Sequence, residues 1–210
     1  MTPRTKALLI VAAFTLLIVA VFKTPLLRAA GSALVSEDPL APADIIVVPQ
    51  WSQEPGAIEA ADLVKAGIAS RVAVLAEGGN PSTQELIRRG VLPPNNNVWL
   101  VSLLRYLGVA DVEQIAESAN GTENEGDVLP LWCDRHHYHT VVVLSTPDHS
   151  RRVKRVLDRS MRGHDTRIII RYTRYSTYDP SRWWQSRDGT RTEIVEMEKL
   201  LLDIVRHPVS

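Results

Sequence analysis

The chain has a single cysteine, Cys133, among its 210 residues. An intramolecular disulfide is therefore excluded, and an exported domain of this chain would depend on its hydrophobic core. The chain also has no net charge, because 24 lysine and arginine residues balance 24 aspartate and glutamate residues. Without a global positive field, nucleic acid is not expected as a partner. The sequence contains no internal repeat and no low-complexity tract.

A glycine-rich dinucleotide fingerprint is missing as well. No Gly-x-Gly-x-x-Gly follows the first predicted strand, residues 43–48. The glycines of that fingerprint allow the backbone to approach a pyrophosphate group. A cofactor-dependent oxidoreductase is therefore disfavoured, and the residues themselves indicate no certain cofactor.

One long apolar run is present, from Ala7 to Phe22, and only Thr15 interrupts it. Its 16 residues would rise about 24 Å as a helix, against roughly 30 Å for the hydrocarbon core of a bilayer. Flanking lysines can extend to the headgroups, and the positive N-terminus favours the cytoplasmic side. We therefore predict a transmembrane signal-anchor within residues 1–30, a cell-membrane location and an extracytoplasmic C-terminal domain.

A cleaved signal peptide is the alternative for this segment. Ala29-Ala30-Gly31 has small residues at the spacing that a signal peptidase accepts. The apolar run is at or above the usual upper length of about 15 residues for such peptides, and Lys23 and Arg28 separate it from the small residues. These features favour an uncleaved anchor. Residues 31–42, with two prolines and few large apolar residues, are predicted to form a linker to one domain at 43–210.

Strand-like and helix-like segments alternate through this domain. β-Branched runs predict buried strands, and apolar residues three or four apart predict helices. The predicted strands are residues 43–48, 71–75, 140–144 and 167–170, with 112–117 left open as a short strand. The predicted helices are residues 57–66, 82–90, 98–107, 122–134, 150–159 and 190–206. The alternation indicates an α/β, Rossmann-like, doubly wound and mainly parallel sheet with helices on both faces.

Four polar turns each follow a predicted strand: residues 49–51, 77–79, 118–125 and 145–152. In parallel α/β sheets, ligands bind outside the carboxyl ends of the strands, so these turns are expected to share one rim. The last turn also opens a helix, whose unpaired N-terminal amides attract anions. The sequence therefore predicts where a site lies, but not what it binds.

Several short motifs, in order along the chain, resemble the YdcF/SanA/ElyC-like envelope proteins, a bacterial family long labelled as of unknown function. The resemblance covers roughly Asp44 to the C-terminus. Its motifs are residues 43–48, 60–67, Gly78-Gly79, Gly108-Val109 leading to Ile115 and Thr122, residues 146–152, and Trp183-Trp184, Arg187, Gly189, Glu196 and Lys199. The resemblance implies an anchored protein of envelope integrity or peptidoglycan metabolism and, as in one branch of the family, a nucleotide-type ligand.

The chain departs from the family pattern in three places. The family's first loop is usually glycine-rich, whereas residues 49–52 are Pro-Gln-Trp-Ser, whose side chains occupy space that a phosphate would need. Asn124 precedes Glu125, the reverse of the family's order. Residues 93–106 look like an insertion or an extended helix, which could form a lid or additional core.

His149 is the strongest catalytic candidate. An imidazole exchanges protons near neutral pH, and the segment around it looks like the family's Thr-x-x-His-x-x-Arg, with Thr146 and Arg152 as ligand-binding residues. Arg152 lies one helical turn beyond His149 and could grip a phosphate or carboxylate in a bidentate manner. The alternatives are a histidine that only caps its helix and an arginine on a solvated face.

Thr122 and Glu125 allow two interpretations. As a capping box they would only begin a helix. As site residues, Thr122 would donate its hydroxyl to a bound anion, Asn124 would hydrogen-bond the ligand and Glu125 would take part in catalysis. Gly78 and Gly79 could likewise admit a ligand to the backbone or form a plain turn, with Glu77 beside them as a base or an exposed acid.

Three further groups of residues could belong to a functional site, but a structural role is the simpler interpretation of each. Cys133, His136, His137 and His139 are zinc-type ligands, yet they fall between a helix and a strand, at the opposite rim, so no metal site is predicted. Core packing is the default for Trp183-Trp184, although they could wall the pocket or lie at a membrane interface. Glu196 and Lys199 are one turn apart and most simply pair with each other.

The expected function is that of a membrane-anchored extracytoplasmic protein that binds or processes an anionic small molecule or a lipid-linked cell-wall precursor. In this interpretation Arg152 and nearby amides hold the anion while His149 exchanges a proton. The alternative is a non-catalytic envelope scaffold with a vestigial pocket, which the Pro49-Gln50-Trp51 departure favours.

Overall fold

The computed structural model describes residues 3–79, 81–92 and 98–209, with the backbone alone at 3–4, 6–13, 15–20 and 98. Within this part of the chain, five strands form one sheet: β1 Ile45–Pro49, β2 Arg71–Glu77, β3 Asp111–Ala119, β4 Thr140–Ser145 and β5 Arg167–Tyr172. Their pairings are all parallel, and their order is β3-β2-β1-β4-β5. The predicted α/β, Rossmann-like class is therefore confirmed.

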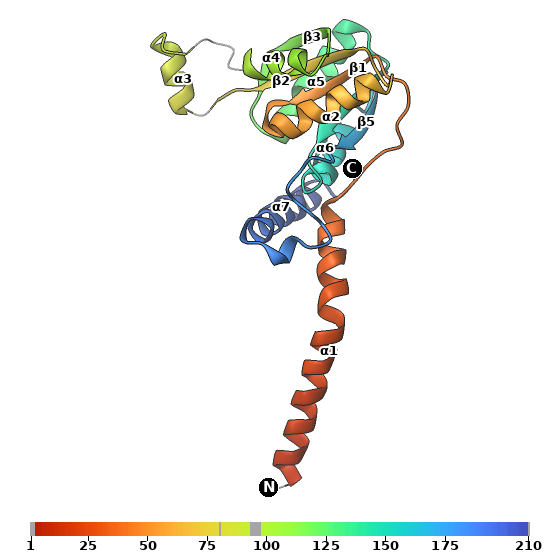
Figure 1. Cartoon of the computed structure of the whole chain (residues 1–210), viewed down its shortest axis with the longest axis vertical. Coiled ribbons are helices and arrows are strands. Elements are labelled where there is room, and N and C mark those ends of the chain that lie inside the picture. Colours follow the sequence, from red (N-terminus) through yellow and green to blue (C-terminus); the bar gives the residue numbers. More distant parts are fainter. Residues whose placement is uncertain (1–2, 80, 93–97, 210) are drawn as a thin grey trace.

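Helices cover both faces of this sheet (Figure 1). The helices of the described part are α1 Pro3–Leu34, α2 Gln53–Lys65, α3 Pro81–Arg88, α4 Val98–Tyr106, α5 Thr122–His136, α6 Ser150–Ser160 and α7 Arg187–Arg206, with short 3-10 turns η1 Gln50–Ser52 and η2 Trp183–Gln185. Side chains alternate between the two faces of a strand. Ile46 and Val48 accordingly pack with α2 and α4, whereas Ile45 and Val47 pack with α5 and α6. The sheet is thus doubly wound.

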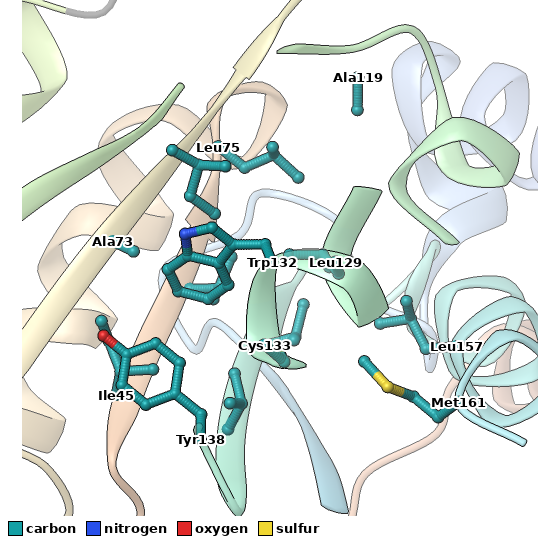
Figure 2. Packing of buried hydrophobic residues seen from close by; sticks show 14 of the residues in the cluster. Ile45, Ala73, Leu75, Ala119, Leu129, Trp132, Cys133, Tyr138, Leu157 and Met161 are labelled. Carbon is teal, nitrogen blue, oxygen red and sulfur yellow. The ribbon is translucent and has the colours of Figure 1, made fainter. Parts of the chain in front are cut away.

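The α5–α6 side of the core contains the larger side chains (Figure 2). Trp132 and Leu129 of α5 and Leu157 of α6 pack against Ile45 and Leu75 of the sheet. These side chains are almost completely buried, so the crossing of α5 from β3 to β4 is fixed by packing. That crossing determines where the first residue of α5 lies.

The strand order reverses beside β1, because the chain first adds β2 and β3 on one side and then β4 and β5 on the other. In open α/β sheets such a switch point leaves a crevice between the outgoing connections at the carboxyl ends of the strands. Here the crevice lies between the turn after β1 and the turn after β4. The fold therefore places two of the four predicted rim turns, those after β1 and β4, on either side of the crevice.

Several boundaries differ from the sequence prediction. The segment left open at 112–117 is the nine-residue strand β3. α2 begins at Gln53 and α7 at Arg187, earlier than predicted, since polar first turns carry little periodic signal. Of the possible lid at 93–106, residues 93–97 lie outside the described part, and α4 buries Leu100 and Leu104 in the core. The preceding helix α3 has no buried residue and projects from the domain (Figure 1).

Helix α1 contains the apolar run and extends away from the sheet, with its C-terminal end beside α7 (Figure 1). Among the residues that the structure describes, no helix is both long enough and apolar enough to span a membrane. The segment predicted as a linker, residues 31–42, packs on the domain, and its residues 31–34 form the end of α1. The backbone N–H of Asp38 donates to the carbonyl of Ile170, and the Asp38 carboxylate accepts from the backbone N–H of Ile170. The backbone N–H of Ser36 donates to the Ser150 hydroxyl. Composition alone does not reveal this packing.

Candidate functional site

A cavity of about 580 Å3 opens at the switch point. The turns after β1, β3, β4 and β5 contribute to its wall, and α7 closes it from one side. Its lining residues are Trp51, Gly121, Thr122, Thr146, Asp148, His149, Arg152, Ser176, Thr177, Tyr178, Thr192, Glu196 and Lys199. Four of the eight predicted site residues, Thr122, Thr146, His149 and Arg152, therefore lie together.

Thr122 enters the cavity because the chain turns sharply after β3. Gly121 adopts a φ of 82°, in the left-handed region that favours glycine, and Thr122 is the first residue of α5. The capping-box interpretation is wrong, since Gly121 is the N-cap residue and no side chain caps this helix end. The Thr122 hydroxyl instead lies 3.0 Å from Nε2 of His149 and accepts a hydrogen bond of 2.8 Å from Nη1 of Arg152.

His149 lies between Thr122 and a carboxylate that the sequence did not connect with it. Its Nδ1 is 2.8 Å from Oε2 of Glu196 on α7. A carboxylate oxygen only accepts, so Nδ1 carries the proton and Nε2 is left with its lone pair toward the Thr122 hydroxyl. Nη2 of Arg152, 2.9 Å from Nδ1, is a second donor to the same Glu196 oxygen, at 3.1 Å. Glu196 and Arg152 thus both contact the Nδ1 side of the imidazole.

Two cations converge on the Glu196 carboxylate. Arg152 donates to Oε2, and Nζ of Lys199 donates to Oε1 at 2.6 Å, as the sequence predicted for that pair. Burial by itself raises the pKa of Glu196, but the hydrogen bonds from His149 and Lys199 and the charge of Arg152 outweigh it and lower the pKa to about 2. Glu196 therefore stays ionised at neutral pH and orients the imidazole.

Glu125, predicted as a catalytic group, supports the site from behind instead of lining the cavity. Its Oε1 accepts a 2.5 Å hydrogen bond from Nε1 of Trp51, and the Trp51 ring packs edge-on against His149 with 4.7 Å between centroids. Burial raises the pKa of Glu125 despite that hydrogen bond. Trp51 therefore connects this buried acid to the imidazole. In the sequence it was recognised only as a departure from the family's glycine-rich loop.

Asp148 adds a second carboxyl group to the cavity wall. Burial raises its pKa, although a hydrogen bond from the Thr146 side chain acts in the opposite direction. Thr146 thus contacts an acid of the protein. The cavity combines an imidazole, a guanidinium, an ammonium group and two carboxyl groups, which together can hold an anion and exchange protons.

Three predicted ligand residues lie apart from this cavity. Gly78 gives room to Asn120, because a Cβ at position 78 would lie 2.6 Å from the Asn120 side chain. Gly79 has a φ of 73°, as a tight turn requires. The Asn124 side chain accepts from the backbone N–H of Asn120 and does not line the cavity. None of these three residues lines the cavity.

Sequence reasoning missed the turn after β5. Ser176, Thr177 and Tyr178 line the cavity, and the Tyr178 hydroxyl donates to Glu193 of α7. Burial and that contact raise the pKa of Tyr178. This turn follows a strand just as the other four do, so the same rim rule would have found it.

The Cys133 and histidine cluster lies at the opposite edge of the sheet, as predicted. His136 stacks on Tyr138, and burial raises the pKa of the Cys133 thiol to about 12. Among the described residues, one group of metal-type atoms lies close together, those of Glu123, Asp203 and His207. Arg155 and Arg159 both donate to Asp203, so its charge is already balanced.

Trp183 and Trp184 do not wall the cavity. Nε1 of Trp183 donates to the backbone carbonyl of Leu27 in α1 at 2.7 Å, and the ring packs against Leu34 and Leu200. This contact fixes the C-terminal end of α1 against the domain. The Trp184 ring lies nearly perpendicular to Trp183 and lines a shallow surface hollow along α7.

No family model and no curated protein matches this chain. Among solved structures, a universal stress protein in complex with cAMP is similar at 13% identity and a TM-score of 0.36, over 65% of this chain and 100% of that one. A universal stress protein from Archaeoglobus fulgidus is similar at 18% identity and a TM-score of 0.36, over 60% of this chain and 92% of that one. Likenesses at this level carry no argument about the site.

Proposed function

We propose that this chain is a membrane-anchored extracytoplasmic protein that binds or processes an anionic small molecule or a lipid-linked cell-wall precursor in envelope maintenance. One observation carries the proposal: His149 and Arg152 meet Thr122 in an open cavity at the switch point of the sheet. A guanidinium in a partly buried cavity binds phosphate or carboxylate groups strongly, and the imidazole can exchange a proton with the bound molecule.

The surroundings of the cavity favour a negatively charged ligand. α5 and α6 both begin at its wall, and the partial positive charge at a helix N-terminus attracts anions. Lys199 is half-exposed, so its ammonium group can leave Glu196 and turn toward a ligand. A nucleotide-type molecule is one such ligand, although the cavity contains no glycine-rich loop for its phosphates.

The path along α7 favours a lipid-linked ligand. A second hollow shares Asp148, Thr192 and Glu196 with the cavity, and a third shares Arg191 and Val195 with the second. The third is mainly apolar, with Trp184 and Ile194 in its lining. The charged cavity and the apolar hollow thus lie along the same helix with one hollow between them, an arrangement that suits a molecule with a polar head and an apolar chain.

The anchor is the remaining part of the proposal. α1 carries the apolar run of residues 7–22 and leaves the domain beside α7, where the apolar end of the path lies (Figure 1). An anchor in this helix would hold the apolar hollow near the bilayer surface. A lipid-linked molecule could then reach the cavity without leaving the membrane.

A non-catalytic scaffold is the second candidate, and one observation favours it. Glu196 already accepts hydrogen bonds from both Arg152 and Lys199, so the cations of the cavity have a partner within the protein. A ligand would have to compete with this carboxylate. In a scaffold the network would only connect α6 to α7.

A thermal-shift measurement on the full chain in detergent separates the two candidates. Inorganic phosphate, a polyprenyl phosphate and a mononucleotide would each be titrated against the wild type, Arg152→Ala and His149→Ala. A ligand that binds the folded protein raises the melting temperature by mass action, by several degrees at a hundred times Kd. We expect a shift with polyprenyl phosphate that Arg152→Ala abolishes and that the exposed control Arg162→Ala retains.

The same variants test the role in the cell. Loss of envelope-stress tolerance in well-folded His149→Ala and Arg152→Ala variants is expected if the cavity works. Full tolerance in both variants, with no shift by any of the three compounds, would favour the scaffold.

A further inference from the structure

The geometry points to a nucleophile–base–carboxylate triad made of Thr122, His149 and Glu196. We infer that the Thr122 hydroxyl attacks an acyl carbon and forms a covalent intermediate. The inference rests on the proposed use of this cavity as a substrate site. It goes beyond anion binding, because it assigns Thr122 a role as the reacting atom and Glu196 a role as the group that orients the base.

The hydrogen bonds of the three residues run in one direction. Nδ1 of His149 donates to Glu196 at 2.8 Å, and its free Nε2 faces the Thr122 hydroxyl at 3.0 Å. A hydroxyl next to an imidazole that a carboxylate orients can lose its proton as it attacks, which is the arrangement that activates nucleophiles in hydroxyl–histidine–carboxylate enzymes. The order of the three residues along the chain does not matter for this assignment, because such triads are recognised by their geometry.

The backbone presents Thr122 in a suitable position. The residue follows a strand after a two-residue turn, and Gly121 in the left-handed region makes the turn sharp. Nucleophiles of α/β hydrolases occupy a comparable strand-to-helix turn. The N-terminal end of α5 at Thr122 favours the negative charge that develops on the attacked oxygen.

Arg152 completes the electrostatics. Its Nη1 donates to the Thr122 hydroxyl at 2.8 Å, so a positive charge lies one hydrogen bond away from the reacting oxygen. All three triad residues are at most 9% exposed, yet each lines the cavity, so a substrate can reach side chains that are largely shielded from solvent. Electrostatic stabilisation is strongest in such an environment.

The reaction proceeds in two balanced steps for an ester substrate. The Thr122 oxygen bonds to the carbonyl carbon while Nε2 of His149 takes its proton, and the ester C–O bond then breaks as the leaving alcohol takes that proton. A water molecule gives a proton to Nε2 and bonds to the acyl carbon. The bond to Thr122 breaks, the hydroxyl recovers its proton, and a carboxylic acid is released.

Covalent labelling tests this assignment on the full chain in detergent. A fluorophosphonate probe loses fluoride when an activated hydroxyl attacks its phosphorus, and peptide mapping then identifies the labelled residue. We expect stoichiometric labelling at Thr122, labelling that persists in Thr122→Ser, and none in Thr122→Val. His149→Ala and Glu196→Gln should be labelled at least about 100-fold more slowly, the loss typical for removal of a general base. Thr140→Val, at the opposite end of β4, should behave as the wild type.

Hydrolysis of p-nitrophenyl butyrate by the same proteins gives a second readout. The inference is overturned if the wild type is labelled elsewhere than at Thr122, or is neither labelled nor hydrolytic. Mapping on the wild type decides the matter even if Thr122→Val does not fold. The triad and the anion site can be tested separately. If Thr122→Val is not labelled but keeps the thermal shift induced by phosphate, both proposals are supported. If the wild type is labelled at Thr122 but no anion shifts its melting temperature, the triad is supported and the anion site is rejected.

Discussion

Oε2 of Glu196 lies 2.8 Å from Nδ1 of His149, although 47 residues separate them in the chain. This contact joins the first residues of the helix after β4 to the middle of the C-terminal helix. It places a carboxylate where it can orient the imidazole. The properties of the site follow from this contact and from the groups around it.

The first prediction concerns the acid stability of the Glu196 network. Glu196 has a pKa of about 2 in the folded protein, against a usual value of 4.5. A lowered pKa contributes stability that is complete above the unfolded value and is lost as the pH falls toward the folded value. The free energy of unfolding should therefore fall more steeply between pH 5 and 2 in the wild type than in Glu196→Gln, by about 3 kcal/mol.

Chemical denaturation at several pH values measures this difference. The exposed Glu198→Gln on the same helix is the matched control and should follow the wild type. An equal pH dependence in the wild type and Glu196→Gln would show that the network does not hold the carboxylate in its charged form.

The second prediction concerns Glu125, whose pKa burial raises. A buried carboxyl with a raised pKa costs stability once the pH exceeds its unfolded value. Glu125→Gln keeps an acceptor for Nε1 of Trp51 and removes the charge. The variant should be at least as stable as the wild type at pH 7, and the two should converge below pH 4. Destabilisation of the variant by more than about 1 kcal/mol at pH 7 would indicate that the charge itself stabilises the fold.

The third prediction concerns the contact between α5 and α6 at Gly126. A Cβ at this position would lie 2.4 Å from Oγ of Ser160 and 2.9 Å from Cγ1 of Val156. Gly126→Ala should therefore destabilise the protein by about 1–3 kcal/mol through overpacking. Adding Ser160→Gly should restore part of the loss, because it removes one of the two clashes. A double variant no more stable than Gly126→Ala alone, measured by thermal and chemical unfolding, would contradict this assignment.

The fourth prediction concerns Glu59, a fully buried carboxylate on α2. It accepts hydrogen bonds from the backbone N–H and the guanidinium of Arg174, and Arg171 lies 3.6 Å away. Glu59→Ala removes the carboxylate partner of Arg174 and one of the two carboxylates near Arg171, the other being Glu37, and should cost about 3 kcal/mol of unfolding free energy. The exposed Glu54→Ala on the same helix is the control, expected within about 0.5 kcal/mol of the wild type. Similar losses in both variants would contradict a specific role for Glu59.

The fifth prediction concerns the single thiol. Cys133 is fully buried, and burial raises its pKa to about 12, so the reactive thiolate is scarce at pH 8. The folded protein should not react with a disulfide reagent such as dithionitrobenzoate within an hour, whereas the protein in guanidinium should release one equivalent of product. Ser70→Cys adds an exposed thiol that should react at once. Fast reaction of native Cys133 would indicate local opening of α5.

The sequence alone determined the class of fold and the rim on which the site lies. β-Branched runs such as residues 140–144 and periodic helices are local patterns, and the parallel arrangement places the ends of all strands on one edge. His149, Thr122 and Arg152 could therefore be expected together, because each follows a strand or lies one turn beyond such a position.

Only the tertiary structure decided which of those residues meet and what they do. Gly78 and Gly79 do not line the cavity, whereas the packing of α7 brings in Glu196, which the sequence pairs only with its neighbour Lys199. Helix propensity specifies a helix but not the direction in which it packs, and hydrogen bonds between residues distant in sequence depend on that direction. Tertiary packing likewise decided that Thr122 contacts His149 and does not cap its helix.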